Sequence, residues 1–136
     1  YYADRAVVVV NPEVSSVRDS DRILGLLSSK TKKAEDGGRI IEHLLLTRYN
    51  PARVEKQEML SIADVEEILG LKVVGVIPEA PEVLQSSNLG NPVILNEESD
   101  AGQAYTDAVA RILGEDRPMR FTSVEKKSFF SKIFGG

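Results

Sequence analysis

Residues 5–10 read R-A-V-V-V-V, and this run points directly to the fold class of the chain. Two similar runs follow it, E-H-L-L-L-T at residues 42–47 and K-V-V-G-V-I at residues 72–77. All three are largely continuous apolar stretches, whereas a strand with one face in water alternates between apolar and polar residues. Each run is therefore predicted to be a strand of a sheet that is covered on both faces.

Helical patterns separate the predicted strands. Ser16 is followed three residues later by Asp19, a capping pattern that predicts a helix from there to about Ser29. The inward-facing positions of this helix are expected to be Val17, Ile23, Leu24 and Leu27. Residues 30–38 follow as a polar loop.

Two further helices are marked at their ends. Ser61 and Asp64 repeat the capping pattern, and Gly70 suits the left-handed residue that ends a helix. Residues 99–113 carry apolar side chains at a period of about 3.6 residues, and Gly114 follows them. Strands and helices thus alternate, which predicts an α/β fold with a mostly parallel sheet and right-handed crossovers.

Composition narrows the classes of function. The 136 residues are 42% hydrophobic and 28% charged, as in an ordinary globular domain, and a net charge of −4 gives no bulk attraction to nucleic acid. There is no cysteine and one histidine, His43, which excludes disulfides, thiolate chemistry and paired-histidine metal sites, so no metal site is predicted. No run approaches the roughly 20 apolar residues of a membrane-spanning helix, and no secretory leader is visible.

The end of the sequence differs in charge from the rest. Residues 117–136 contain five basic residues and one acidic residue, so they carry +4 and residues 1–116 carry −8. An acidic body with a basic tail suggests two different roles. Pro118 and the polar residues after it predict a linker over 117–123, between a domain over 1–116 and a last helix over 124–136.

The last segment has the pattern of an interfacial helix. Its aromatic and aliphatic side chains occupy one sector of about 140° on a helical wheel, with lysines at or near it. Such a helix places its rings at the acyl boundary and its lysines against anionic headgroups. The predicted membrane-binding residues are Lys126, Lys127, Phe129, Phe130, Lys132, Ile133 and Phe134. The alternative is a helix that packs against its own domain, but its position after a polar linker favours the membrane.

A single copy of this segment is expected to bind membranes weakly, because an isolated helix of about 11 residues is marginal in water. Two copies on a dimer would bind far better, since the second attachment is intramolecular. Dimerisation is therefore a physical route to control membrane residence.

Two strand ends form a second candidate site. Thr47-Arg48 ends the second predicted strand, and Pro78-Glu79 ends the third. Ligands of open α/β sheets bind beyond the carboxyl ends of the strands, where these residues could offer carbonyls, a guanidinium and a proline face to a flat base. Ordinary turn chemistry remains an alternative, because Asn-Pro and Pro-Glu pairs are common turn formers.

The motifs that hold phosphates are absent from the sequence. Neither G-x-x-x-x-G-K-[ST] nor G-x-G-x-x-G occurs, and no G-x-S-x-G elbow accompanies the single histidine. The chain therefore has no phosphate cradle, and no catalytic residue is predicted in it.

Several strings carry a family resemblance. The longest are N-P-E-V-S-S-V-R-D-S-D-R-I at 11–23, E-H-L-L-L-T-R-Y-N-P at 42–51 and V-G-V-I-P-E at 74–79. They resemble the MinD branch of the MinD/ParA deviant-Walker ATPase family. The likeness runs over essentially the whole chain, including the phenylalanine-rich ending, and is loosest over 31–41.

The resemblance implies the C-terminal half of a mostly parallel, doubly wound P-loop NTPase sheet. In this family the phosphate-binding loop and the switch segments lie in the first half. ATP and Mg²⁺ are thus implied as cofactors of a full-length parent, and whether this chain alone is an enzyme stays open. The adenine side of the pocket carries over as Thr47, Arg48, Pro78 and Glu79. Related proteins have an asparagine where Thr47 stands, which leaves the base contact open.

The resemblance also implies partners. They are a second copy in the ATP state, an anionic membrane surface, the division inhibitor MinC, and MinE, which stimulates hydrolysis. The residues implied to contact protein partners are Met59, Asp64, Asn88 and Gly90. A compatible alternative is that Asp64 caps its helix and that Asn88 and Gly90 shape a loop. The implied location is cytoplasmic, peripheral on the inner face of the cell membrane.

Three hypotheses follow for the function. The leading one is the C-terminal portion of a MinD-like ATPase that regulates septum placement. The second is a non-enzymatic membrane-binding module that works alone. The third is a related cargo-positioning ATPase, which would not be expected to end in a helix of phenylalanines and lysines. A sheet that lacks half its strands is also expected to expose an unpaired, apolar edge.

Overall fold

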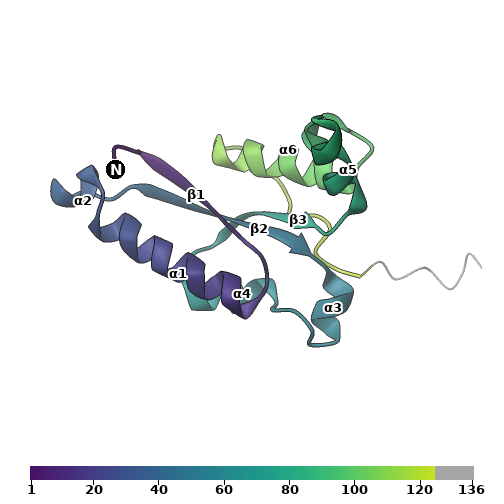
Figure 1. Cartoon of the computed structure of the whole chain (residues 1–136), viewed down its shortest axis with the longest axis horizontal. Coiled ribbons are helices and arrows are strands. Elements are labelled where there is room, and N and C mark those ends of the chain that lie inside the picture. The colour runs from purple at the N-terminus through teal and green to yellow at the C-terminus, as the bar shows by residue number, and fades with distance from the viewer. Residues whose placement is uncertain (125–136) are drawn as a thin grey trace, which may run out of the picture.

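A parallel sheet lies at the centre of the computed structural model, which describes residues 1–124 (Figure 1). Strands β1 (Arg5–Val10), β2 (Ile41–Tyr49) and β3 (Val73–Pro78) lie in the order β1-β2-β3. Both strand pairs are parallel, so the predicted fold class and strand positions are confirmed. The helix predicted over 124–136 lies outside the described residues but for its first position.

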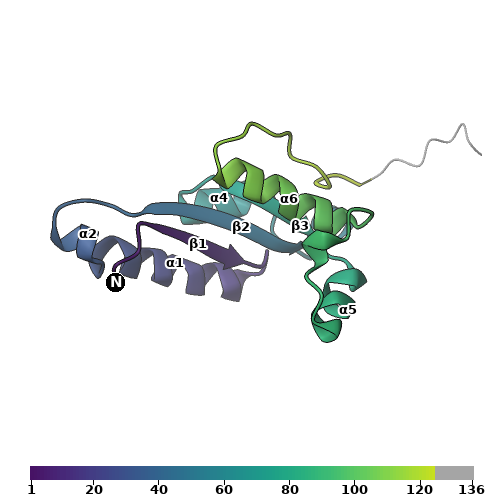
Figure 2. The same cartoon turned by 90° about the horizontal axis from the view of Figure 1, so that it is seen from above.

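Helices cover the two faces of the sheet. Helices α1 and α4 pack on one face, and α6 packs on the other with α5 beyond it (Figures 1 and 2). The helices are α1 (Val14–Ser29), α2 (Lys32–Glu35), α3 (Pro51–Glu55), α4 (Ile62–Leu69), α5 (Pro81–Leu89), the 3-10 turn η1 (Val93–Leu95) and α6 (Asp100–Ile112). Within residues 1–124, no helix is both long and apolar enough to cross a membrane.

The two faces of β2 supply two separate cores. Leu44 and Leu46 are fully buried against the α1 and α4 side, where Val17 and Val65 meet them. Leu45 points the other way and packs with the small side chains of α6. Each buried leucine stabilises the fold by about 1.5–3 kcal/mol. This two-sided burial is why the β2 run is continuously apolar.

Helix α1 begins at Val14, and its N-cap lies three residues before the predicted N-cap, Ser16. The N-cap is Glu13, whose side chain makes no capping hydrogen bond. Its backbone N–H donates to the Asn11 carbonyl oxygen at 2.8 Å, so the chain already turns here. The Ser16 hydroxyl instead accepts a 3.0 Å hydrogen bond from the Asn11 N–H. The predicted capping of α1 by Ser16 is therefore wrong, because this turn starts the helix earlier.

The predicted start and end of α4 are confirmed. The Ser61 hydroxyl accepts from the Asp64 N–H at 3.1 Å, and the Asp64 carboxylate accepts from the Ser61 N–H at 3.0 Å. Gly70 ends the helix with a left-handed φ of 65°. Three other helices, α2, α3 and α5, were not predicted; they span only 4, 5 and 9 residues, and α2 lies within the stretch 30–38 that was predicted to be a polar loop. Segments this short carry too few turns for a clear helical period.

Glycine lets α6 lie close to the sheet. A Cβ atom on Gly75 would lie 2.5 Å from the Ala108 Cβ and 2.9 Å from the Leu45 Cδ1. Only a hydrogen fits at this position of β3. The close contact places the start of α6 beside the carboxyl end of β3, where the candidate site lies.

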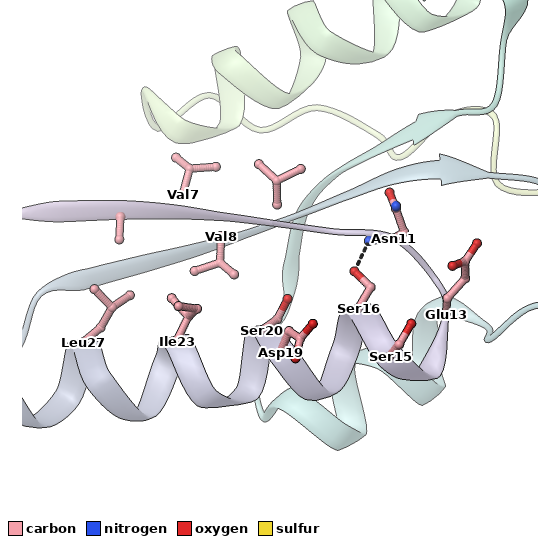
Figure 3. A pocket seen from close by; sticks show the side chains of 12 residues that line it. Val7, Val8, Asn11, Glu13, Ser15, Ser16, Asp19, Ser20, Ile23 and Leu27 are labelled. Atoms are coloured by element: carbon pink, nitrogen blue, oxygen red, sulfur yellow. Dashed lines mark hydrogen bonds between the residues drawn. The ribbon is translucent and has the colours of Figure 1, made fainter.

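The outer edge of β1 has no strand partner within residues 1–124. On the face away from α1, Val7 is 47% exposed and Val9 is 57% exposed. A groove of about 640 Å³ runs between this edge and α1, and Ile23 lines it instead of facing the core (Figure 3). The expected unpaired, apolar edge is therefore present, and the inward position predicted for Ile23 is wrong because no element covers it there.

Candidate functional site

The carboxyl ends of β2 and β3 meet in an open hollow of about 540 Å³. All four residues predicted for the adenine side of a nucleotide, Thr47, Arg48, Pro78 and Glu79, line it. Helix α5 and Tyr105 of α6 supply the remaining walls. The structure thus brings these residues together, as parallel strand ends require. Their role in binding a nucleotide stays a prediction.

A bulge in β2 sets the direction of Arg48. Three residue steps on β2, from Leu46 to Tyr49, match two steps on β3, from Val76 to Pro78. Arg48 absorbs the extra residue with a φ of 57°, a left-handed conformation that costs a non-glycine residue about 1–2 kcal/mol. Bulges of this kind re-aim side chains beside functional sites. Here the bulge turns the guanidinium toward β3.

The Glu79 carboxylate lies between two side chains, those of Arg48 in β2 and of Asn50 directly after β2. Its Oε1 is 3.9 Å from the Arg48 Nη2, and its Oε2 accepts a 3.3 Å hydrogen bond from the Asn50 amide. Arg48 is largely exposed, so this ion pair contributes at most about 1 kcal/mol. Its main effect is to orient a guanidinium and a carboxylate at the mouth of the hollow.

Thr47 has a structural partner. Its hydroxyl donates a 2.9 Å hydrogen bond to the Asn11 side-chain oxygen, which joins the ends of β2 and β1. Asn11 lies at this edge although it was not among the predicted site residues. A signal was available, because Asn11-Pro12 follows β1 as Asn50-Pro51 follows β2. Asn11 adds an amide to the row of strand-end polar groups.

The walls of the hollow are largely apolar. Pro78 and Val83 present aliphatic faces, and the Tyr105 ring is partly buried beside them. Burial raises the pKa of the Tyr105 phenol above its ordinary value, so the group stays protonated and can donate a hydrogen bond. An apolar wall with a few polar groups at its rim suits a flat heteroaromatic ring.

The residues predicted to contact protein partners do not form one patch. Met59 is buried at 9% exposure, and its sulfur accepts from the Asn50 N–H at 3.4 Å. Asp64 caps α4, on the α1 side of the sheet. Asn88 is exposed on α5, and Gly90 ends that helix with a φ of 71°, on the α6 side. Capping and loop shaping are therefore visible, and partner contact stays a prediction.

The predicted membrane-binding residues, Lys126 to Phe134, lie outside the described residues. What the structure describes is the approach to them. Residues 117–123, predicted as a linker, lie along α6 and are held there by arginine side chains.

Comparisons with known proteins agree on one family. No family model matches the chain. The chain is 60% identical over its whole length to the septum site-determining protein MinD of Neisseria meningitidis serogroup B, of which it covers 50%. It also superposes on a chain of the MinC:MinD cell division protein complex of Aquifex aeolicus with a TM-score of 0.78 and 38% identity, covering 89% of this chain and 47% of that one.

A more distant structure shares the fold. The MinD of Pyrococcus horikoshii, solved in complex with Mg-ADP, gives a TM-score of 0.65 at 22% identity, covering 81% of this chain and 41% of that one. This likeness supports a P-loop NTPase fold alone. The chain spans about half the length of the curated relatives that it matches.

Proposed function

Since this chain belongs to the MinD family, we propose that it forms the C-terminal portion of a MinD-like ATPase that regulates placement of the division septum. The observation that carries the proposal is the 60% identity to a septum site-determining protein over the whole length of the chain. The convergence of Thr47, Arg48, Pro78 and Glu79 on one hollow supports it independently.

The strand-end hollow takes the base of ATP in this proposal. Its apolar walls fit a flat ring, and the guanidinium of Arg48 and the carboxylate of Glu79 offer polar contacts at the rim. The phosphates and Mg²⁺ are assigned to the rest of the parent, because this sequence has no G-x-x-x-x-G-K-[ST] loop. By itself the chain is therefore expected to be inactive as an ATPase.

The open edge of β1 is the surface where the remainder of the ATPase domain joins. An unpaired strand edge offers a row of backbone N–H and C=O groups to a further strand. The exposed Val7 and Val9 offer apolar area to a covering element. Within residues 1–124 both β1 and β3 lack an outer strand partner, and β1 also leaves Val7 and Val9 exposed; a short sheet of this kind in a chain of half the family length fits a partial domain.

Residues 124–136 form the membrane-binding helix in this proposal. The ATP-bound parent dimerises and presents two such helices, which hold anionic membrane together far better than one. The membrane-bound dimer then recruits MinC and MinE, with Met59, Asp64, Asn88 and Gly90 contributing from this half. The A. aeolicus structure described as a MinC:MinD complex supports the first of these partners.

ATP hydrolysis provides the first test. It is measured for this chain alone and for a version extended at the amino end by its own upstream coding sequence. Hydrolysis by the extended form only is the expected result. If the extension adds no activity while vesicle binding is intact, the chain is instead a membrane-binding module that works without an ATPase.

Vesicle sedimentation provides the second test, with a matched control. Phe130→Glu with Phe134→Glu places two charges in the predicted apolar sector and is expected to abolish binding to anionic vesicles. Ser128→Glu with Ser131→Glu adds the same charge on the opposite side of the wheel. This control is expected to weaken binding much less, by loss of headgroup attraction alone. If both variants lose vesicle binding to the same degree, the prediction that the tail binds the membrane through one apolar face is wrong.

A further inference from the structure

The segment after α6 turns back and runs along that helix toward its start (Figures 1 and 2). We call residues 113–124 the strap. Three polar residues of α6, Gln103, Asp107 and Arg111, contact it. They are spaced four residues apart and therefore share one face of the helix.

Arg111 ties the strap to the sheet. Its Nε donates to the Arg117 carbonyl oxygen at 3.0 Å, and its Nη2 donates to the Pro118 carbonyl oxygen at 2.6 Å. Its Nη1 donates to the Val74 carbonyl oxygen of β3 at 3.1 Å. One guanidinium thus joins a strand, a helix and the strap. A lysine in its place could not reproduce this planar set of donors.

Asp107, one turn before Arg111 in α6, also holds the strap. Its side chain is only 6% exposed and accepts from the Arg120 Nε at 2.7 Å and from the Arg117 Nη1 at 3.3 Å. Arg120 also donates to the Gln103 side chain at 2.8 Å. Charge-assisted hydrogen bonds of this type are about twice as strong as neutral ones. A nearly buried carboxylate that accepts hydrogen bonds from two arginines of the strap fixes the strap to α6. We call this contact the anchor.

The strap ends at the carboxyl edge of the sheet. Helix α6 runs antiparallel to the strands, so a segment that returns along it finishes where the strands finish (Figure 2). Phe121 packs there against the core around Leu45 and Ile77. It has a left-handed φ of 60°, and the Arg120 guanidinium lies 5.1 Å from its ring centroid. The start of the tail is therefore set near the strand-end hollow.

We propose that Asp107 and Arg111 are positioning residues. They fix where the membrane-binding tail leaves the body, at the carboxyl edge of the sheet beside the strand-end hollow. The membrane half of this inference rests on the proposed function; the anchor itself does not. With the strap held, the tail is tethered at about residue 124. With the strap released, the tether starts at Gly114 and is longer by the strap's length. A longer tether lowers the effective concentration of the second tail and so weakens attachment of the dimer.

The anchor is tested by a distance measurement in the chain. The sequence has no cysteine, so Gln85→Cys on α5 and Ser123→Cys on the strap can carry a pair of spin labels. The expected result is a narrow distance distribution that broadens in Asp107→Asn. Arg111→Lys is a second variant that keeps the charge and is expected to broaden it also. Asp116→Asn, at an exposed strap position, is the matched control and should leave it narrow.

Two outcomes of this measurement would overturn the anchor. One is a broad distribution before any change is made to Asp107 or Arg111. The other is a narrow distribution that survives both variants.

The role in membrane attachment is tested on the amino-terminally extended protein with ATP, using vesicles of phosphatidylglycerol and phosphatidylcholine. Asp107→Asn is expected to weaken binding of the dimer several-fold, and Asp116→Asn is not. A synthetic peptide of residues 124–136 measures the affinity of the tail without the body. If Asp107→Asn broadens the distance distribution between the labels but leaves vesicle binding unchanged, the positioning role is overturned. If the extended protein without substitutions does not bind vesicles, the proposed membrane function is wrong. The distances between the labels still test whether Asp107 and Arg111 hold the strap.

Discussion

The backbone N–H of Glu79 donates a 2.8 Å hydrogen bond to the carbonyl oxygen of Tyr49. This contact joins the residues that follow the bulge in β2 to those that follow β3. It brings the Glu79 carboxylate within reach of Arg48 and Asn50. The proposed base-binding rim therefore depends on strand-end geometry as much as on its side chains.

Substitutions of Arg48 separate the effect of its backbone conformation on stability from the effect of its guanidinium on nucleotide binding. Arg48→Ala and Arg48→Gly both remove the guanidinium, so both are expected to weaken nucleotide binding by the extended protein to a similar degree. Only glycine accepts a φ of 57° without strain, so Arg48→Gly should be more stable than Arg48→Ala by about 1 kcal/mol. Urea unfolding and nucleotide titration measure the two effects. Unchanged nucleotide affinity in both variants would remove Arg48 from the site.

Gly75 is predicted to tolerate no side chain. Gly75→Ala would push a methyl group against Ala108 and Leu45, and overpacking of this kind costs about 1–3 kcal/mol. Gly25 is the matched control, since it lies in α1 with no atom within 4 Å of the added methyl. Gly25→Ala should stabilise the chain by about 0.5–1 kcal/mol. The urea midpoints of the two variants should move in opposite directions, and a shift in the same direction would contradict the close contact of α6 with β3.

The strap anchor predicts a dependence of stability on pH. The hydrogen bond from Arg120, followed by that from Arg117, lowers the pKa of Asp107 below its ordinary value, although burial opposes this. A carboxyl group with a lowered pKa in the folded state stabilises the fold above its unfolded pKa, near 3.8, and loses that contribution as pH falls through the folded value.

The Asp107→Asn variant isolates this contribution. The difference in unfolding free energy between the parent chain and Asp107→Asn should be constant at neutral pH. It should shrink as pH falls below about 4. Other carboxylates titrate in both proteins and largely cancel in the difference. A difference that does not change with pH would show that Asp107 has no special interaction with the strap.

The open edge of β1 predicts self-association of the isolated chain. Val9→Lys places a charge on this edge strand, a device that natural proteins use against edge-to-edge pairing. It should reduce concentration-dependent association in sedimentation velocity experiments. Ile68→Lys is the control, because Ile68 is similarly exposed, at 52%, but lies on α4. A chain that is monomeric and melts cooperatively without any substitution would contradict the prediction.

Local patterns predicted much of the fold. The runs at Arg5, Glu42 and Lys72 became β1, β2 and β3. Burial on both faces selects continuous apolar residues in β2 and β3, whereas the predicted cover on both faces is not present at β1, where Val7 and Val9 are exposed. The capping box of Ser61 and Asp64 and the end at Gly70 were readable because they act within one helical turn. The pairing of Arg48 with Glu79 at one edge followed from the parallel order of the strands.

The sequence by itself thus determined the strands, their parallel order, the two helices α4 and α6 with both their ends, and the gathering of Thr47, Arg48, Pro78 and Glu79. Only the tertiary structure decided the left-handed Arg48 and the return of the strap along α6. Periodicity and capping express interactions within about one turn of chain. The strap instead depends on contacts such as Arg120 with Gln103, 17 residues apart, which no local pattern encodes.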